Sequence, residues 1–405
     1  MPLKNHYFFT LGRNPSLSVI EIVRYMEINS MDYQIIEYNV GENPILILTT
    51  VGKLKVYSIC DILAGSIKAG RLWLKTTPER VEDDLANSFF YVEDTKKIQF
   101  CLDLYGPNLD YETIYAYFRN QFKSMKQKAM LKDYTPSALA NAMKRDYFMD
   151  IVGIESNVQP NTVYMGRTTS VSDINERKKR YERRPVVDEK IATSVRLARM
   201  LVNFAGIEKG SHVLDPFCGI GTVLGEVLML GGIAHGLELD QGRVKDCKSN
   251  LQWILHEYKI EGSYDIKNGD ATKIQEYFEP KSIDILVTEP ELGPFLRKVP
   301  HSNKAEQIIS NLRHLYKGFF KNAGTLLKDR AKLVVVLPEI PIKGGKSRKM
   351  NINNLISNTD IVMKRLTISK RSGINIPEIQ NPVIYKEHWH KIIRNIYILE
   401  KKLKS

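Results

Sequence analysis

One stretch, residues 213–222, constrains the fold of this chain more than any other part of the sequence. Two apolar residues lead into Asp215, then a Pro, a Phe, a Cys and a Gly-x-Gly follow, and an apolar helix pattern continues over 223–230. This order is typical of a buried parallel strand, a tight glycine turn and the first turn of a helix. The glycines allow backbone conformations that a Cβ would forbid. The stretch therefore predicts a doubly wound α/β sheet with a nucleotide-like ligand at this turn.

From residue 189 onward the sequence alternates between strand and helix patterns. Helices are expected over 191–205, 223–230, 244–255 and 308–327. Strands are expected over 213–214, 233–239, 266–268, 283–288, 332–337 and 392–399. Such a succession of strands and crossover helices predicts a mostly parallel sheet.

The preceding part of the chain has an α+β pattern without this rhythm. Strands over 7–11 and 44–51, with helices over 18–26 and 53–64, form a first expected unit, 1–75. Strands over 98–105, 148–152 and 162–169, with helices over 111–128 and 135–146, form a second expected unit, 76–172.

Composition excludes several classes of protein. The 405 residues, 43% hydrophobic and 26% charged, indicate a globular chain of two or three domains. The four cysteines form no Cys-x-x-Cys pair, which argues against disulfides and zinc and favours a reducing cytoplasm. The N-terminus does not read as a signal peptide, and no window holds about 18 apolar residues, so we expect no membrane span.

The net charge of +13 favours a polyanionic partner, although a lysine-rich solvated surface would give the same balance. Six basic residues gather within 176–185, in a connector over 173–188. This connector is either a solvated linker or a segment that contacts phosphates. The candidate phosphate contacts are Lys123, Lys126, Lys128, Arg177, Lys178, Lys179, Arg180, Arg183 and Arg184.

Three acids follow successive strands of the α/β half. Asp215 ends the first strand, Glu238 ends the second about 20 residues on, and Asp270 follows the third. A carboxylate at the second position accepts ribose hydroxyls in such sheets. Each acid alone could be an ordinary strand-end residue, but the three in this order favour a cofactor site.

The string Asp-Pro-Phe-Cys-Gly-Ile-Gly-Thr over 215–222 resembles motif I of S-adenosylmethionine-dependent methyltransferases, in the branch that methylates nucleic-acid bases. The resemblance implies S-adenosyl-L-methionine as cofactor, with Asp270 facing its adenine amino group. The candidate cofactor-binding residues are Asp215, Pro216, Phe217, Cys218, Gly219, Gly221, Thr222, Glu238, Leu239, Asp270 and Ala271.

The segment 288–295 resembles the catalytic motif IV of amino methyltransferases, in which an acid, amide or Ser precedes Pro-Pro and an aromatic. Glu289 and Pro290 fit this pattern, whereas Glu291 and a Leu replace the second Pro and the aromatic. The resemblance implies that Glu289 accepts a hydrogen bond from the amine of the base and that Phe295 stacks on the base. Glu291 competes for the acid's role, because side chains two residues apart on an extended segment point the same way. An altered or lost active site is the alternative.

The opening stretch 8–22 is similar to the start of archaeal and eukaryotic tRNA guanine-N2-methyltransferases, and Arg184-Pro185 before 197–203 is similar to their entry into the catalytic domain. The resemblance implies a ferredoxin-like domain over 1–75, a THUMP-like RNA-binding domain over 76–172 and a basic linker over 173–188. A Rossmann-like methyltransferase domain with a mostly parallel seven-stranded sheet would then occupy 189–405.

This resemblance implies methyl transfer to the exocyclic N2 of a guanosine in tRNA, with tRNA as partner, in the cytoplasm. A small activating protein is a possible further partner, because eukaryotic members of the family use one. Two alternatives remain open: an amino methyltransferase acting on another base of DNA or RNA, and a non-catalytic RNA-binding protein that keeps the cofactor fold.

Overall fold

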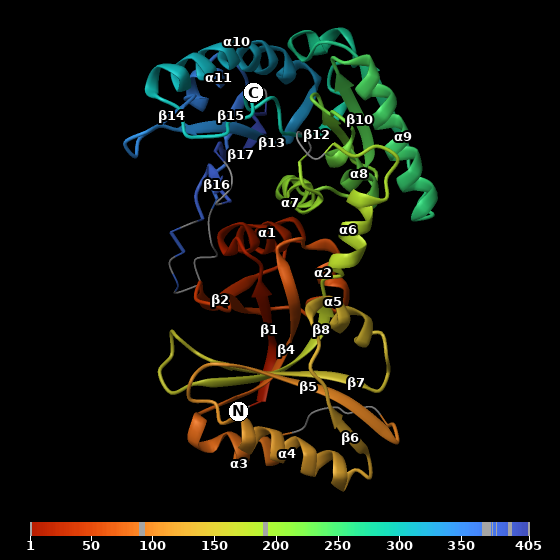
Figure 1. Cartoon of the computed structure of the whole chain (residues 1–405), viewed down its shortest axis with the longest axis vertical. Helices are drawn as coiled ribbons and strands as arrows, with labels where there is room; N and C mark the ends of the chain where they lie inside the picture. The colour runs from red at the N-terminus through yellow and green to blue at the C-terminus, as the bar shows by residue number, and fades with distance from the viewer. Residues whose placement is uncertain are drawn as a thin grey trace. The chain divides into compact units, whose positions relative to one another are not determined.

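The computed structural model describes residues 2–88, 94–188, 193–366, 374, 376–377, 379–387 and 391–403. The chain divides into two compact units, Met1–Glu176 with Ile368–Pro377, and Arg177–Thr367 with Glu378–Ser405 (Figure 1). Helix α6 (Ile174–Glu182) contains the boundary between them. Among the described residues, no helix has both the length and the apolar content to cross a membrane.

The N-terminal unit is built on one eight-stranded sheet in the order β2-β3-β1-β4-β8-β7-β5-β6. Its strands are β1 (Pro2–Leu11), β2 (Tyr33–Asn39), β3 (Ile45–Thr50), β4 (Ser66–Thr76), β5 (Lys97–Tyr105), β6 (Lys128–Leu131), β7 (Phe148–Glu155) and β8 (Val163–Val171). Its helices are α1 (Pro15–Ile28), α2 (Ile59–Ile62), α3 (Val81–Ala86), α4 (Tyr111–Ser124) and α5 (Pro136–Ala142), with short 3-10 turns η1 (Val56–Ser58) and η2 (Pro78–Arg80).

The sheet runs without a break across the boundary expected at residues 75 and 76. Strand β4, which the sequence analysis does not anticipate, pairs with β1 on one side and with β8 on the other. The division into a ferredoxin-like and a THUMP-like domain therefore stays a prediction. The helix expected over 111–128 ends at Ser124, and Lys128 begins the edge strand β6.

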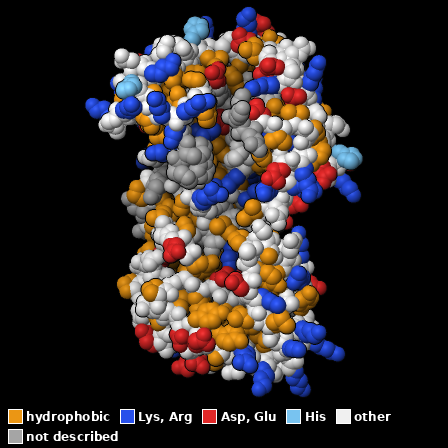
Figure 2. All heavy atoms as spheres, viewed as in Figure 1, with side chains coloured by type: hydrophobic (Ala, Val, Ile, Leu, Met, Phe, Trp, Pro, Cys, Tyr) orange, Lys and Arg blue, Asp and Glu red, His pale blue; other side chains and the backbone are white. Residues whose placement is uncertain are grey.

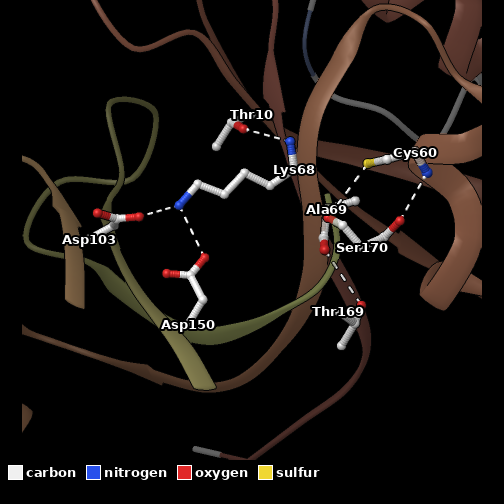
Figure 3. A network of polar contacts seen from close by, with 8 residues as sticks. All are labelled: Thr10, Cys60, Lys68, Ala69, Asp103, Asp150, Thr169 and Ser170. Carbon is white, nitrogen blue, oxygen red and sulfur yellow. Dashed lines mark hydrogen bonds and ion pairs between the residues drawn. The ribbon is translucent and has the colours of Figure 1, made fainter. Parts of the chain in front are cut away.

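A buried polar network joins the two expected halves of this sheet (Figure 3). Lys68 of β4 extends between Asp103 of β5 and Asp150 of β7, and its Nζ lies 3.1 Å from Asp150 Oδ2. Asp150 is completely buried. The two carboxylates hold the pKa of Lys68 above its usual value, against the opposing effect of burial. The network therefore fixes β4 against strands that lie far from it in sequence.

The C-terminal unit holds a mixed sheet in the order β11-β10-β9-β12-β13-β17-β15, to which β14 and β16 add at β13 and β17. Its strands are β9 (His212–Asp215), β10 (Ile233–Glu238), β11 (Tyr264–Asn268), β12 (Ile283–Thr288), β13 (Leu327–Pro341), β14 (Ser347–Lys349), β15 (Ile361–Met363), β16 (Val383–Tyr385) and β17 (Ile393–Lys401). Its helices are α7 (Val195–Ala205), α8 (Thr222–Met229), α9 (Gln241–Glu257), α10 (Ser302–Leu326) and α11 (Ile352–Ile356), with the 3-10 helix η3 (Ala271–Glu276).

The predicted seven-stranded, mostly parallel sheet needs correction. The five strands from β11 to β13 are parallel, as expected, but β17 runs antiparallel to β13 and β15 antiparallel to β17. The sheet contains nine strands among the described residues. The additional strands β14, β15 and β16 have three residues each, which is too short for a hydrophobic period to be detected.

Helices cover both faces of this sheet, as the crossover pattern predicts (Figure 1). On one face, Tyr316 and Phe319 of α10 share a core cluster with Leu333 and Val335 of β13. Alternate residues of a strand point to the same face, so Val334 points to the other side, where α7 packs on β12 and β13. The inner parallel strands β9 and β12 are buried on both faces, and the carboxyl ends of the parallel strands carry the candidate site.

Candidate active site at the carboxyl ends of the parallel strands

The predicted strand, glycine turn and helix lie at the centre of the C-terminal unit. β9 ends at Asp215, and α8 begins at Thr222 after an N-cap at Gly221. Gly219 and Gly221 have φ angles of +53° and +87°, which side chains rarely adopt. A Cβ on Gly221 would lie 2.8 Å from Cys247 Sγ, so this position also needs the close approach that only glycine permits.

Asp215 fastens this loop to the neighbouring strand β12. Its Oδ1 accepts hydrogen bonds from the Thr288 hydroxyl (2.6 Å) and from the Phe217 amide (3.1 Å). Burial raises the pKa of Asp215 to about 7, although both hydrogen bonds lower it, and the charges of Glu238 and Glu289 raise it further. Asp215 therefore organises the loop from beneath rather than facing solvent.

Glu238 stands at the end of β10, directly beside the glycine loop. Its Oε2 accepts from the Gly219 amide at 3.0 Å and its Oε1 from the Asp240 amide at 3.0 Å. The side chain is only half-buried, in contrast to that of Asp215. The following Leu239 is 73% exposed. An acid with two anchored oxygens thus borders open space above the loop.

Asp270 follows β11 and begins the next turn. Its Oδ1 accepts from the amide and the hydroxyl of Thr272, both at 2.8 Å, so it caps η3. The preceding Gly269 donates its amide to the Glu238 carbonyl at 2.9 Å, which holds the ends of β10 and β11 together. Ala271 is buried in the core. The three acids predicted for this edge of the sheet therefore lie at neighbouring strand ends.

Several motif I side chains are engaged by the protein itself. Cys218 is buried, and its hydrogen bond to Cys247 and then burial raise its pKa well above the usual value. Phe217 packs edge-on against Phe319 with ring centres 5.5 Å apart. Pro216 is buried, and the Thr222 hydroxyl accepts a hydrogen bond from Arg184 at 2.8 Å. These side chains support the loop, and the open groups are the loop backbone and the acids.

Glu289, the predicted catalytic acid, follows β12 and is held by two partners that the sequence analysis does not identify. Its Oε1 accepts from Arg394 Nε of β17 at 2.5 Å, and its Oε2 accepts from the Thr193 hydroxyl. The Glu289 side chain is 8% exposed. The only sequence signal for Arg394 is a cation beside Asn395 in a stretch, 392–399, that is otherwise rich in Ile, Leu and Tyr, because the pairing depends on strand order.

The rest of the motif IV segment leaves the strand at once. The Glu289 side chain is mostly buried whereas Glu291 is exposed, so the two acids do not point the same way, as they would on an extended segment. Pro290, between them, is buried. Tyr316 donates its hydroxyl to the Glu291 carbonyl at 3.0 Å and fixes this bend. Phe295 is 85% exposed, an unusual state for a large aromatic side chain.

The candidate phosphate contacts fall into two groups, one in each unit. Lys123, Lys126 and Lys128 are exposed at the end of α4 and the start of β6. Figure 2 shows Lys and Arg side chains gathered at the lower right edge of the N-terminal unit in this view, over α4 and β6.

The connector over 173–188 is not a solvated linker throughout. Much of it forms α6, where Lys178 is exposed, Arg177 is half-buried, and Lys179 pairs with Glu257 at 2.6 Å. Arg183 is exposed just beyond α6. Arg180 and Arg184 are buried, with 8% and 6% of each residue exposed.

Comparisons with known proteins agree with this architecture. Residues 184–356 match a family model described as "RMKL-like, methyltransferase domain". The chain is similar to the tRNA (guanine(10)-N2)-dimethyltransferase of Pyrococcus abyssi, with 35% identity over 121 residues, 30% of this chain and 34% of the relative. It is also similar to a probable tRNA (guanine(10)-N2)-dimethyltransferase of Methanothermococcus thermolithotrophicus, with 32% identity over 162 residues, 39% of this chain and 83% of the relative.

The matched part spans 34%, 38% and 35% of three of the curated relatives. Among solved structures, TrmN from Thermus thermophilus has a TM-score of 0.50 and 12% identity, covering 98% of this chain and 99% of TrmN. A possible methylase from Clostridium difficile 630 gives the same TM-score and identity over 99% of both chains. At this identity the two structures show a shared fold that extends over both units.

Proposed function

The chain belongs to the tRNA (guanine(10)-N2)-dimethyltransferase family, and we propose that it transfers methyl groups from S-adenosylmethionine to the exocyclic N2 of a guanosine in tRNA. The observation that carries this proposal is the Thr288–Asp215 hydrogen bond of 2.6 Å. It holds Glu289, the next residue along the chain, beside the glycine loop. An acid suited to a base amine and a loop suited to the cofactor therefore share one edge of the sheet.

The residues at this edge fit S-adenosylmethionine. A Cβ built on Gly219 meets no atom within 4 Å, so the space over the loop is open to a ligand. Glu238, anchored by the Gly219 amide, has lone pairs left for two ribose hydroxyls. Asp270 uses Oδ1 to cap η3, and its second oxygen is suited to the adenine amino group. When bound, the cofactor supplies an electrophilic methyl group.

Glu289 would act on the guanine amine, which is a poor nucleophile because its lone pair is delocalised into the ring. A carboxylate within hydrogen-bond distance stabilises the positive charge that develops on this nitrogen and accepts the proton that leaves it. Arg394 and Thr193 each occupy one lone pair of the Glu289 oxygens. Carboxylate oxygens have further lone pairs, so Glu289 retains capacity for the amine.

Phe295 would supply the ring on which the flipped base stacks. Enzymes that modify a base hold it between aromatic or apolar side chains after it leaves the helix. The 85% exposure of Phe295, six residues after Glu289, leaves its face available to a planar ligand. Pro290 would shape the turn that separates the acid from this ring.

The N-terminal unit, with its lysines at α4 and β6, is the proposed tRNA-binding part. The relatives' name points to guanosine 10 and to two added methyl groups, and we include both in the proposal. The cytoplasm is the proposed location. Whether a small activating protein takes part stays open, as in the sequence analysis, and the test below addresses it.

The test combines the purified protein alone, S-adenosylmethionine and an unmodified tRNA transcript, followed by mass spectrometry of the nucleosides. We expect N2-methylguanosine and N2,N2-dimethylguanosine, and neither product from a transcript with adenosine at position 10. Methylated adenosine or cytosine would identify an amino methyltransferase with a different target. Binding of S-adenosylhomocysteine and of tRNA without any methylated product would favour the non-catalytic alternative or the need for an activating protein, and adding cell extract separates these two.

A further inference from the structure

Three buried arginines contact side chains of α8, but only two of them pair with an acid. Arg180 Nε and Arg199 Nε donate to the two oxygens of Glu226, at 2.8 Å and 2.5 Å. The third, Arg184, donates from Nη1 to the Thr222 hydroxyl at 2.8 Å, and its guanidinium lies 4.9 Å from the centre of the Tyr181 ring. Arg184 forms no ion pair with any residue that the structure describes.

The free edge of the Arg184 guanidinium is buried. Nε and Nη2 have no hydrogen-bond partner among the described residues, although Arg184 is only 6% exposed. Burial lowers the pKa of Arg184, against the smaller opposing effects of Tyr181 and Asp188. An uncompensated buried charge of this kind destabilises a fold unless a ligand pairs with it. The Nε–Nη2 edge matches the two oxygens of a carboxylate.

The N-terminus of α8 adds a second attraction for an anion at the same place. Gly221, at the N-cap, has no side chain to accept from the amides of the first turn. These amides carry the positive end of the helix dipole and favour a negative group. Thr222, the first residue of α8, is the residue that Arg184 contacts, so the cation, a hydroxyl and the helix N-terminus converge at the end of the glycine loop.

We propose that Arg184 binds the α-carboxylate of the methionine part of S-adenosylmethionine, with the Thr222 hydroxyl and the first turn of α8 beside it. The inference rests on the proposed function, because the glycine loop must first hold this cofactor. An RNA phosphate is the other source of such an oxyanion. The burial of Arg184 favours the cofactor, because the adjacent Arg183 is exposed and would be reached first by a nucleic-acid backbone.

Calorimetry with two nucleosides tests the proposal: S-adenosylhomocysteine, and its decarboxylated form, which keeps the amine but lacks the carboxylate. The variants are Arg184→Met, Arg184→Lys and the control Lys248→Met, which removes an exposed charge on α9. We expect Arg184→Met to lower the affinity for S-adenosylhomocysteine by about 10- to 100-fold, since hydrogen bonds to charged groups contribute this much. The affinity for the decarboxylated form should stay unchanged. The affinity of Arg184→Lys for S-adenosylhomocysteine should lie between those of the wild type and Arg184→Met. The affinity of Lys248→Met should match that of the wild type.

The outcomes separate the ligand from the fold. Equal loss for both nucleosides, or a lowered melting temperature in Arg184→Met and Arg184→Lys alike, would show that Arg184 only supports the structure. Unchanged S-adenosylhomocysteine affinity together with weaker RNA binding would assign Arg184 to a phosphate and overturn the proposal. A wild type that binds neither nucleoside would refute the proposed cofactor itself. A wild type that methylates tRNA and binds both nucleosides equally well would refute only the role of Arg184.

Discussion

At the scale of single residues, the acids of the candidate site differ mainly in what occupies their oxygens. Asp215 is buried beneath the loop and Glu238 is tied to loop amides, whereas Glu289 is held by a cation and a hydroxyl. Their places at strand ends could be predicted from sequence because strand ends are local features. The contacts of Arg394 and Arg184 could not be predicted, because they join segments that only the folded sheet brings together.

Replacing Glu289 by Gln tests the catalytic assignment. The amide keeps the shape but loses the negative charge and the ability to accept a proton. We expect methyl transfer to fall by about 100-fold or more, the usual contribution of a positioned acid or base, with cofactor and tRNA affinity unchanged. Glu291→Gln is the matched control, because Glu291 is exposed on the same segment. Full activity in Glu289→Gln with loss in Glu291→Gln would exchange the two roles.

Asp215 predicts a pH dependence of stability. Its pKa of about 7 in the folded protein lies above its ordinary value of 3.8, so the folded state keeps a proton that the unfolded chain has lost. Stability from this group is therefore present at low pH and falls as the pH rises towards 7, by up to about 1.4 kcal/mol per pH unit. Asp215→Asn, compared with wild type by thermal unfolding at pH about 5 and about 7, should flatten this dependence. Parallel curves for the two proteins would contradict it.

At the scale of elements, the parallel core from β11 to β13 and its covering helices follow from apolar runs and helical periods in the sequence. The expected elements that differ from the structure are those whose helical pattern is short or interrupted. The helix expected over 53–64 is only η1 and α2, and the helix expected over 135–146 is the shorter α5. β4 joins the two halves of the N-terminal sheet, and its pairing with β8 depends on segments about 100 residues apart, as the Thr169–Ala69 contact shows.

Lys68 should be the most sensitive position on β4. Lys68→Met leaves Asp150, which is completely buried, without its cation, and breaking such a pair costs about 3–5 kcal/mol of unfolding free energy. Urea unfolding would measure this loss. The double variant Lys68→Met with Asp150→Asn should recover much of it, because no charge remains buried. An exposed lysine change, Lys126→Met, should stay within about 0.5 kcal/mol. Equal effects of both single changes would mean that the network contributes nothing.

At the scale of the whole molecule, only some of the cations behind the net charge of +13 are exposed to solvent. Some cations of the connector form ion pairs within the protein, such as Arg180 with Glu226, whereas the lysines of α4 and β6 are exposed. Composition predicted a polyanionic partner, but it could not separate the cations that hold the fold from those that face outward. The distinction requires burial, which is a property of the folded chain.

The lysines of α4 and β6 predict a measurable salt effect. If Lys123, Lys126 and Lys128 contact phosphates, changing all three to Gln should weaken tRNA binding and flatten the plot of log affinity against log salt. Each lost contact should reduce its slope by about 0.7–0.9. Fluorescence titrations over a range of salt concentrations measure it, and Lys248→Gln on α9 is the control. An unaltered slope in the triple variant would place the tRNA elsewhere.

The ion pair between Glu289 and Arg394 also limits how early during synthesis the candidate site can form. The two residues are 105 positions apart, and Arg394 belongs to β17, which lies between β13 and β15 in the sheet. A ribosome that adds roughly 5–20 residues per second makes Glu289 roughly 5–20 s before its partner. Until β17 has been synthesised, Glu289 lacks this arginine and the edge of β13 that pairs with β17 stays open. The candidate site therefore stays incomplete until the last strands of the sheet have been made, although most of its residues come earlier in the chain.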